Sequence, residues 1–262
     1  MIKHPEFTHI QGLRQLWKDT FGDSDAFLDI FFQTAFSTKR CLCVTMDETV
    51  VAALYWFDCG FGNEKIAYIY AVATAKAFRG QGICHALMEQ THLLLKEKGY
   101  AGAILSPAED SLFHFYKKIG YETCAYVKET HYHNSINSHP APTPEMKIRQ
   151  ISKTEFAKLR RDFLPKTGLI QEDENLDFLE QQATFYAGEN FLLTAQTNDI
   201  STQKHIIGVE FLGDASVIPA IVAFFACTSG TFRMPGKEKP LAMYYAFTTS
   251  ISKPDYLGFI FD

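Results

Sequence analysis

The stretch Phe78-Arg79-Gly80-Gln81-Gly82-Ile83-Cys84 stands between a strand-like run and a helix-like run. Glycines let the backbone approach a ligand closely. A helix that begins directly after such a turn offers unpaired N–H groups and the positive end of its dipole. Arg79 adds a cation to the same turn. The stretch predicts a phosphate-binding turn, although an isolated match of this kind also fits an ordinary strand-to-helix connection.

The elements on both sides of the turn favour the phosphate-binding interpretation. Residues 65–74 alternate as a strand does, and residues 83–98 carry one apolar helical face. Lys98 followed by Gly99 is a typical cationic last turn with a left-handed stop. Residues 101–105 read as a short buried strand. A β-α-β crossover of this type places ligands at the carboxyl ends of the strands.

The elements before the crossover are two helices and a hairpin. Residues 7–36 have helical periodicity that breaks near Phe21-Gly22-Asp23. Residues 40–45 and 50–57 form a predicted hairpin around a four-residue turn. The predicted fold class is therefore α/β with a mixed sheet.

A second helix follows the crossover. Ser106 is the predicted N-cap, Pro107 the first helical residue and Glu109 the capping-box partner. This helix is expected to run to Ile119 and to stop at Gly120, before a strand over 121–132.

The run from Tyr68 to Tyr121 resembles the GCN5-related N-acetyltransferases (GNAT). Their pyrophosphate signature is an arginine or glutamine, two residues, a glycine, one residue, and then glycine or alanine. Arg79, Gly82 and Cys84 occupy these positions. Cysteine departs from the pattern but is still small. The later run Phe115-Tyr116-Lys117-Lys118-Ile119-Gly120-Tyr121 resembles the family's tyrosine-bearing helix and the strand after it.

The resemblance implies the GNAT acyl-CoA N-acyltransferase fold, with acetyl-CoA as co-substrate. The acetyl group would pass to a primary amine that attacks directly, without a covalent enzyme intermediate. Backbone groups of Val72, Ala73 and Thr74 would bind the pantetheine arm, and one of their N–H groups would polarise the thioester carbonyl. The pyrophosphate would be held by the amides of Arg79, Gly80, Gln81, Gly82, Ile83 and Cys84.

Catalysis further needs an acid for the departing thiolate and a base for the amine. Tyr116 suits the acid role, since its phenol is protonated near neutral pH; its alternative is a core tyrosine. Some two-lobed relatives use the terminal carboxylate as base, which makes Asp262 a candidate. The alternative for this apolar tail is a final sheet strand. Other base candidates are Glu64, Tyr70, Glu109, Asp110 and His114.

The second half of the chain carries no comparable motif. Residues 134–145 are polar with three prolines, which is linker composition. We therefore expect a GNAT domain over 1–133, a linker over 134–145 and a C-terminal α/β lobe over 146–262. The β-α-β order recurs in that lobe, so a degenerate GNAT-like copy without a phosphate-binding turn is predicted.

Composition excludes several classes of partner. The chain has 262 residues, 47% of them apolar, and a net charge of -5. Without a long basic run, it is not expected to bind nucleic acid or anionic membranes. Six cysteines without CxxC or zinc spacing favour free thiols in a reducing, cytoplasmic location. No metal is expected, although His131, His133 and His139 lie close in sequence.

The favoured function is acetylation of a small-molecule or peptide amine. The alternatives are a catalytically silent CoA-binding sensor or interaction protein, and transfer of a longer acyl or aminoacyl group. The sequence specifies neither the acceptor nor the oligomeric state.

Overall fold

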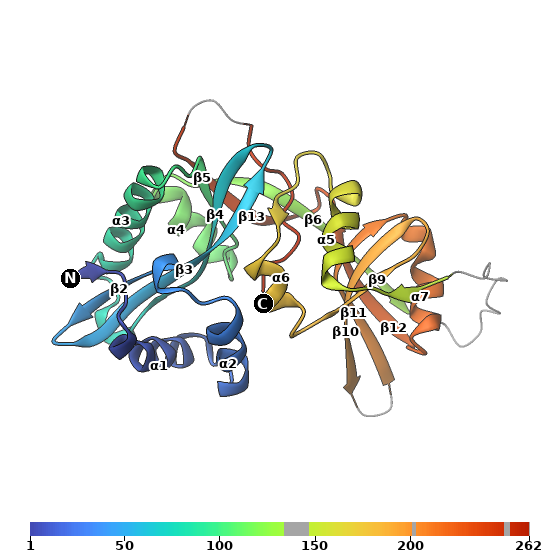
Figure 1. Cartoon of the computed structure of the whole chain (residues 1–262), viewed down its shortest axis with the longest axis horizontal. Coiled ribbons are helices and arrows are strands. Elements are labelled where there is room, and N and C mark those ends of the chain that lie inside the picture. Colours follow the sequence, from blue (N-terminus) through green and yellow to red (C-terminus); the bar gives the residue numbers. More distant parts are fainter. Residues whose placement is uncertain (134–146, 201–202, 249–251, 262) are drawn as a thin grey trace. The chain divides into compact units, whose positions relative to one another are not determined.

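A computed structural model describes residues 1–133, 147–200, 203–248 and 252–261 (Figure 1). The chain divides into two compact units, and each unit is discontinuous in sequence. The predicted linker over 134–145 lies outside the described residues, so the division at that point stays a prediction. Unit 1 comprises Met1–Cys124, Gln171–Phe178 and Ala242–Lys253; unit 2 comprises Ala125–Ile170, Leu179–Leu241 and Pro254–Asp262.

Two helices follow the short first strand of unit 1, as predicted. Helix α1 (Ile10–Phe21) ends at Gly22, whose φ of 78° is left-handed and favours glycine. Helix α2 (Asp25–Thr34) begins after Ser24, whose hydroxyl accepts a hydrogen bond from the Phe27 amide at 3.2 Å. The predicted break near residues 21–23 is confirmed.

The strands of unit 1 form a mixed sheet in the order β1-β2-β3-β4-β5-β13. Neighbours β1 to β4 are antiparallel, β4 and β5 are parallel, and β13 is antiparallel to β5. The predicted hairpin and β-α-β crossover are both present. The strands are β1 (Ile2–Lys3), β2 (Cys41–Met46), β3 (Thr49–Phe61), β4 (Glu64–Thr74), β5 (Gly102–Leu105) and β13 (Lys239–Ala246).

The two faces of this sheet are covered differently because strand side chains alternate. Helices α3 (Ile83–Glu97) and α4 (Asp110–Lys118) pack on the face that carries Leu54, Trp56 and Ile69. On the other face an aromatic cluster joins sheet and helices: the ring centroids of Trp17 and Phe31 lie 5.1 and 5.2 Å from that of Tyr55. Both faces are therefore closed by helices of unit 1.

The start of α4 differs from the prediction. The helix begins at Asp110 after an extended Glu109 (φ -136°, ψ 152°), and no side chain caps it. The predicted capping roles of Ser106, Pro107 and Glu109 are wrong. The fixed φ of Pro107 also fits non-helical backbone, and residues 106–109 between β5 and α4 are irregular.

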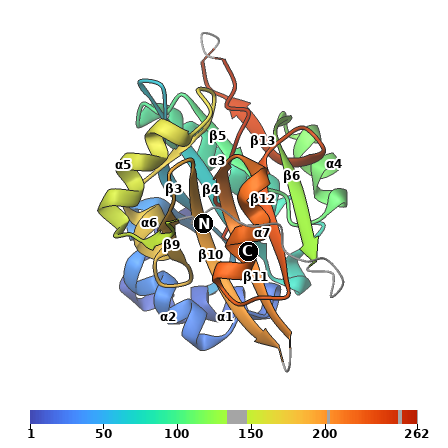
Figure 2. The ribbon, with the colours of Figure 1, turned by 90° about the vertical axis from the view of Figure 1, so that its right-hand side faces the viewer.

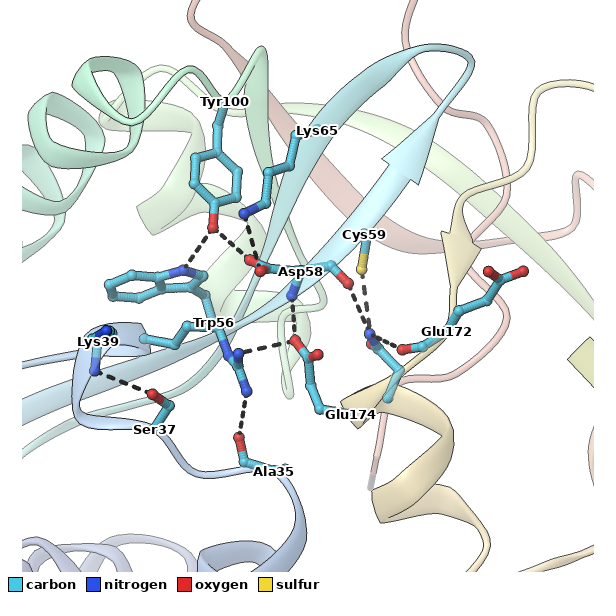
Figure 3. A network of polar contacts seen from close by, with 12 residues as sticks. Ala35, Ser37, Lys39, Trp56, Asp58, Cys59, Lys65, Tyr100, Glu172 and Glu174 are labelled. Carbon is cyan, nitrogen blue, oxygen red and sulfur yellow. Dashed lines mark hydrogen bonds and ion pairs between the residues drawn. The ribbon is translucent and has the colours of Figure 1, made fainter. Parts of the chain in front are cut away.

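A short segment from the second half of the chain covers one edge of β3. Strand β2 pairs with β3 only as far as Tyr55, and the clip, defined here as Gln171–Phe178, covers the edge beyond it. The clip includes part of β8 (Ile170–Gln171), which pairs with β3, and most of α6 (Glu174–Leu179). The Asp58 amide donates to Glu174 Oε1 at 2.8 Å (Figure 3).

The strands of unit 2 follow one another in the order β6-β12-β11-β10-β9-β7, with parallel and antiparallel neighbours. Helix α7 (Ile218–Phe224) connects the parallel neighbours β11 and β12 and lies over them (Figure 2). The β-α-β order expected in this lobe is present with β12 as its last strand. The sequence predicts that strand over residues 241–248 instead, and these belong mainly to β13 and to unit 1. The other elements are β6 (Glu122–His133), β7 (Arg149–Gln150), α5 (Lys153–Phe163), β9 (Thr184–Ala187), β10 (Phe191–Ile200), β11 (Gln203–Gly213) and β12 (Ser229–Pro235).

A buried ion pair fastens the chain's last residues to unit 2. Arg160 Nε and Nη2 donate to the Glu210 carboxylate at 2.7 and 2.9 Å, and the Tyr256 hydroxyl donates to it at 3.1 Å. Residues 256–261 are buried. The sequence left open whether this tail forms a final sheet strand. Among its described residues, the structure gives an isolated β-bridge between Gly168 and Tyr256 and no strand.

Within the described ranges, no helix combines the length and the apolar character needed to cross a membrane.

Candidate functional site

A bulge in β4 lies where this strand stops pairing with β5. Ala71 has a φ of 48°, and the register of β3 with β4 shifts between Ala53 and Tyr55. In the part of the chain that the structure describes, the parallel pairing of β4 with β5 ends at Tyr68. The bulge therefore frees the end of β4, residues 69–74, from β5 on that side.

The glycine turn lies directly beyond the freed strand end. Gly80 and Gly82 have φ values of 75° and 78°, and Gly82 is the N-cap of α3. A Cβ built on either glycine would meet nothing within 4 Å, so the turn backbone borders open space. Arg79 Nε donates to the Thr74 carbonyl at 2.9 Å, which ties the cation to the end of β4.

A cleft of about 550 Å³ joins these features. It reaches from the end of α1, at Thr20 and Phe21, across β4 and the turn to α4. Of the predicted site residues, the cleft is lined by Val72, Thr74, Arg79, Gly80, Gly82, Ile83, Cys84 and Tyr116. Ala73 is 3% exposed and pairs with Ala53, and Gln81 donates to the Ala77 carbonyl at 3.3 Å; neither belongs to the lining.

Tyr116 lies both in the core and on the cleft. Its side chain is 7% exposed and packs against Phe115 and Tyr121, with ring centroids 5.2 and 5.8 Å away. Burial, and next the neighbouring Cys84 thiol, raise the pKa of Tyr116 well above its ordinary value. The phenol is consequently protonated throughout the physiological pH range.

Two further polar side chains, His85 and Glu109, line the same cleft. His85 lies in the first turn of α3, one residue beyond the signature, which is the signal that could have found it. Glu109 is released from its predicted capping role and accepts a hydrogen bond from the Ser111 hydroxyl at 3.4 Å. Burial raises the pKa of the Cys84 thiol to about 11, so this group is neutral.

The structure separates the candidate bases from one another. Glu109 lies on the cleft, whereas Asp110 and His114 line a different groove, beside Lys117 and Glu122. Tyr70 belongs to the aromatic cluster, with its ring centroid 5.6 Å from that of Trp17. Glu64 is the first residue of β4, at the end away from the bulge. Asp262 lies outside the described residues.

The described residues hold no group of three His, Cys, Asp or Glu side chains placed to bind a metal ion. His131 Nδ1 instead forms a hydrogen bond with the Thr231 hydroxyl at 3.1 Å. His139 lies outside the described residues.

Comparisons with known proteins give a family match that lies within unit 1. The family model described as Acetyltransferase (GNAT) domain matches residues 2–124. The fold is similar to that of a GCN5-related N-acetyltransferase from Anabaena variabilis, with a TM-score of 0.75, 14% identity, and coverage of 95% of this chain and 73% of that one. A search of curated proteins gives no match.

Two more solved structures are similar in fold over nearly the whole chain. Eis1 from Mycobacterium abscessus has a TM-score of 0.70 at 11% identity, with 94% of this chain and 73% of that one covered. A putative acetyltransferase from Pyrococcus horikoshii has a TM-score of 0.63 at 13% identity, with 99% and 94% covered. Identities this low establish the fold alone.

A bulged β4, a glycine turn at the start of α3 and a cleft between them belong to an α/β protein with the fold of the GNAT structures. The family match covers residues 2–124, and this part of the chain is similar to GNAT acetyltransferase domains. The predicted fold class is confirmed.

Proposed function

We propose that the protein transfers an acetyl group from acetyl-CoA to a primary amine of a small molecule or peptide. The observation that carries the proposal is a single cleft lined by the turn at Arg79–Cys84, the freed end of β4 and Tyr116. A diphosphate fits this site, because free helix-start amides and the Arg79 cation border open space beside one another.

The residues divide the work of binding. The turn amides hold the pyrophosphate, and Arg79 adds charge at the end of β4. The edge of β4 over Val72, Ala73 and Thr74 offers backbone groups to the amides of the pantetheine arm, much as an added strand would. An N–H from this edge stabilises the oxyanion that forms on the thioester carbonyl.

The proton balance needs one acid and one base. The amine nitrogen forms a bond to the thioester carbon, the carbon–sulfur bond breaks, and Tyr116 gives its proton to the departing thiolate. The proton of the attacking amine passes to a base. Glu109 is the carboxylate that lines the cleft, and Asp262 remains the candidate from the sequence. Measuring kcat for Glu109→Gln and for a chain lacking Asp262 tests each separately, since loss of the base lowers kcat in one variant only.

Acetyl-CoA turnover is the decisive measurement. Thiol release from acetyl-CoA, recorded across a panel of small-molecule and peptide amines, is expected to rise above the amine-free rate with at least one of them. Calorimetry with CoA is run in parallel. CoA binding with no turnover on any amine would overturn the enzymatic proposal in favour of a silent CoA-binding protein, a reading that the unusual Cys84 supports. Faster turnover of longer acyl-CoA thioesters would overturn the acetyl assignment alone.

A further inference from the structure

A second ionisable side chain accompanies Arg79 at the turn. His85 is the third residue of α3, is exposed, and lines the cleft together with Arg79, Gly80 and Gly82. The first turn of a helix is also where backbone N–H groups have no intrahelical acceptor. Any anion that the turn holds therefore meets His85 as a side-chain neighbour.

Few charges face His85 from the surrounding elements. From α3 itself the titratable neighbours are Cys84, His92 and Glu89, the last an exposed carboxylate four residues along the helix. Burial raises the pKa of Cys84 to about 11. Burial, and next the His85 charge, lower the pKa of His92 to about 4. Cys84 and His92 are consequently neutral near pH 7.

The remaining elements contribute one cation, one anion and neutral groups. The turn contributes Arg79, and α4 contributes Glu109 and Tyr116, whose phenol stays protonated because burial raises its pKa. Helix α1 contributes Thr20 and Phe21, which carry no charge. Among the described residues that line the cleft, the fixed charges near neutral pH are thus those of Arg79 and Glu109.

We propose that His85 is a pH-dependent ligand for the phosphates of CoA, so that acyl-CoA affinity falls as the pH rises and the imidazole loses its charge. The proposal rests on the proposed function for the identity of the ligand. An imidazolium donates from both ring nitrogens and attracts the anion, whereas neutral imidazole donates from one. Histidine is the side chain that ordinarily changes charge between about pH 5 and 8.

CoA itself carries a phosphate group that titrates, and the experiment must separate its effect on affinity from that of His85. The 3′-phosphomonoester of CoA loses its second proton near about pH 6 and becomes more anionic as the pH rises. Its contribution to affinity therefore has the opposite sign to that of His85. 3′-Dephospho-CoA keeps the diphosphate without this group, and pantetheine lacks phosphate altogether.

Calorimetric titrations between about pH 5.5 and 8 separate these contributions. Wild-type protein is expected to lose about threefold to tenfold in affinity for 3′-dephospho-CoA over this range, the size of one charge-assisted contact. His85→Gln should bind with a flat pH profile. His114→Gln is the matched control, an exposed histidine on α4 that lines a separate groove, and it should keep the wild-type slope. Affinity for pantetheine should not respond to His85→Gln.

A second readout follows the imidazole directly. By linkage, a bound anion that favours the imidazolium shifts the NMR titration of His85 to higher pH when 3′-dephospho-CoA is added. A wild-type slope in His85→Gln, or an NMR midpoint that the ligand does not move, would overturn the role of His85 while leaving CoA binding intact. Failure of CoA and 3′-dephospho-CoA to bind at any pH would instead overturn the proposed function and this proposal with it.

Discussion

Tyr116 must be distinguished from an ordinary core tyrosine, and removal of one oxygen atom does so. Tyr116→Phe keeps the buried ring, so the melting temperature should stay near that of the wild type. Loss of the proton donor should lower kcat at least about tenfold. The pKa of Tyr116 is raised, so the acidic form persists as the pH rises, and the wild-type kcat should show no loss from this group below about pH 10. An unchanged kcat would return Tyr116 to a purely structural role.

Gly82 and Gly99 flank the same helix and permit a matched comparison. Their φ values are 78° and 80°, and a Cβ on either would meet nothing within 4 Å. Alanine at each position should thus cost a similar amount of stability, about 1 kcal/mol, from the left-handed backbone alone. Only Gly82 borders the cleft. We expect Gly82→Ala to raise the KM for acetyl-CoA severalfold and Gly99→Ala to leave it unchanged; equal KM values in steady-state kinetics would contradict the assignment of the turn.

At the scale of elements, the clip shows how a few polar groups fix a segment. Asn175 is fully buried, and its Nδ2 donates to the carbonyls of Asp58 and Glu172 at 2.8 and 3.0 Å. Asn175→Ala removes both of these side-chain hydrogen bonds and should cost about 1–3 kcal/mol. Glu174→Gln retains an acceptor for the Asp58 amide and loses the charge that faces Arg40, at 3.4 Å. It should therefore lower the melting temperature less. Calorimetric scans of both variants test this order, and the reverse order would be inconsistent with it.

Local signals predicted the elements that depend on local chemistry. The break at Gly22, the hairpin of β2 and β3, and the start of α3 after Gly82 follow from turn residues and periodicity. The clip could not be found in this way, because Asn175 and Phe178 are buried by β3, more than a hundred positions earlier in the chain. Strand β12 was not predicted from the sequence, because its alternation of buried Phe232 and Met234 is short and ends in a basic stretch.

The candidate site likewise contains residues that local sequence predicted and residues that depend on the tertiary structure. The turn and Tyr116 were predicted because the resemblance attaches to contiguous motifs, and the cleft does contain them. Glu109 was assigned to a helix cap, since its spacing from Ser106 fits a capping box; the extended backbone before α4 leaves its side chain on the cleft instead. His85 lies just outside the signature, and its exposure to the cleft depends on the tertiary arrangement.

At the scale of the whole molecule, unit 1 is completed by segments from the second half of the chain. Strand β13 pairs with the free edge of β5, with Met243 opposite Leu105 and Tyr245 opposite Ala103. Met243 is 1% exposed within the core, and Tyr245 stacks on His92 at 4.4 Å between ring centroids. The GNAT domain expected from sequence over 1–133 contains neither this strand nor the clip.

A chain cut to residues 1–133 should therefore fail to form a stable domain. It exposes the edge of β5, which can pair with other chains, and it loses part of the apolar core, where each large buried side chain contributes about 2–5 kcal/mol. We expect aggregation and no cooperative transition in calorimetry. Met243→Asp in the full chain is the companion variant, since it damages the same core without shortening the protein, and it should lower the melting temperature sharply. A cooperative transition of 1–133 near that of the full chain would show that β13 and the clip are dispensable to unit 1.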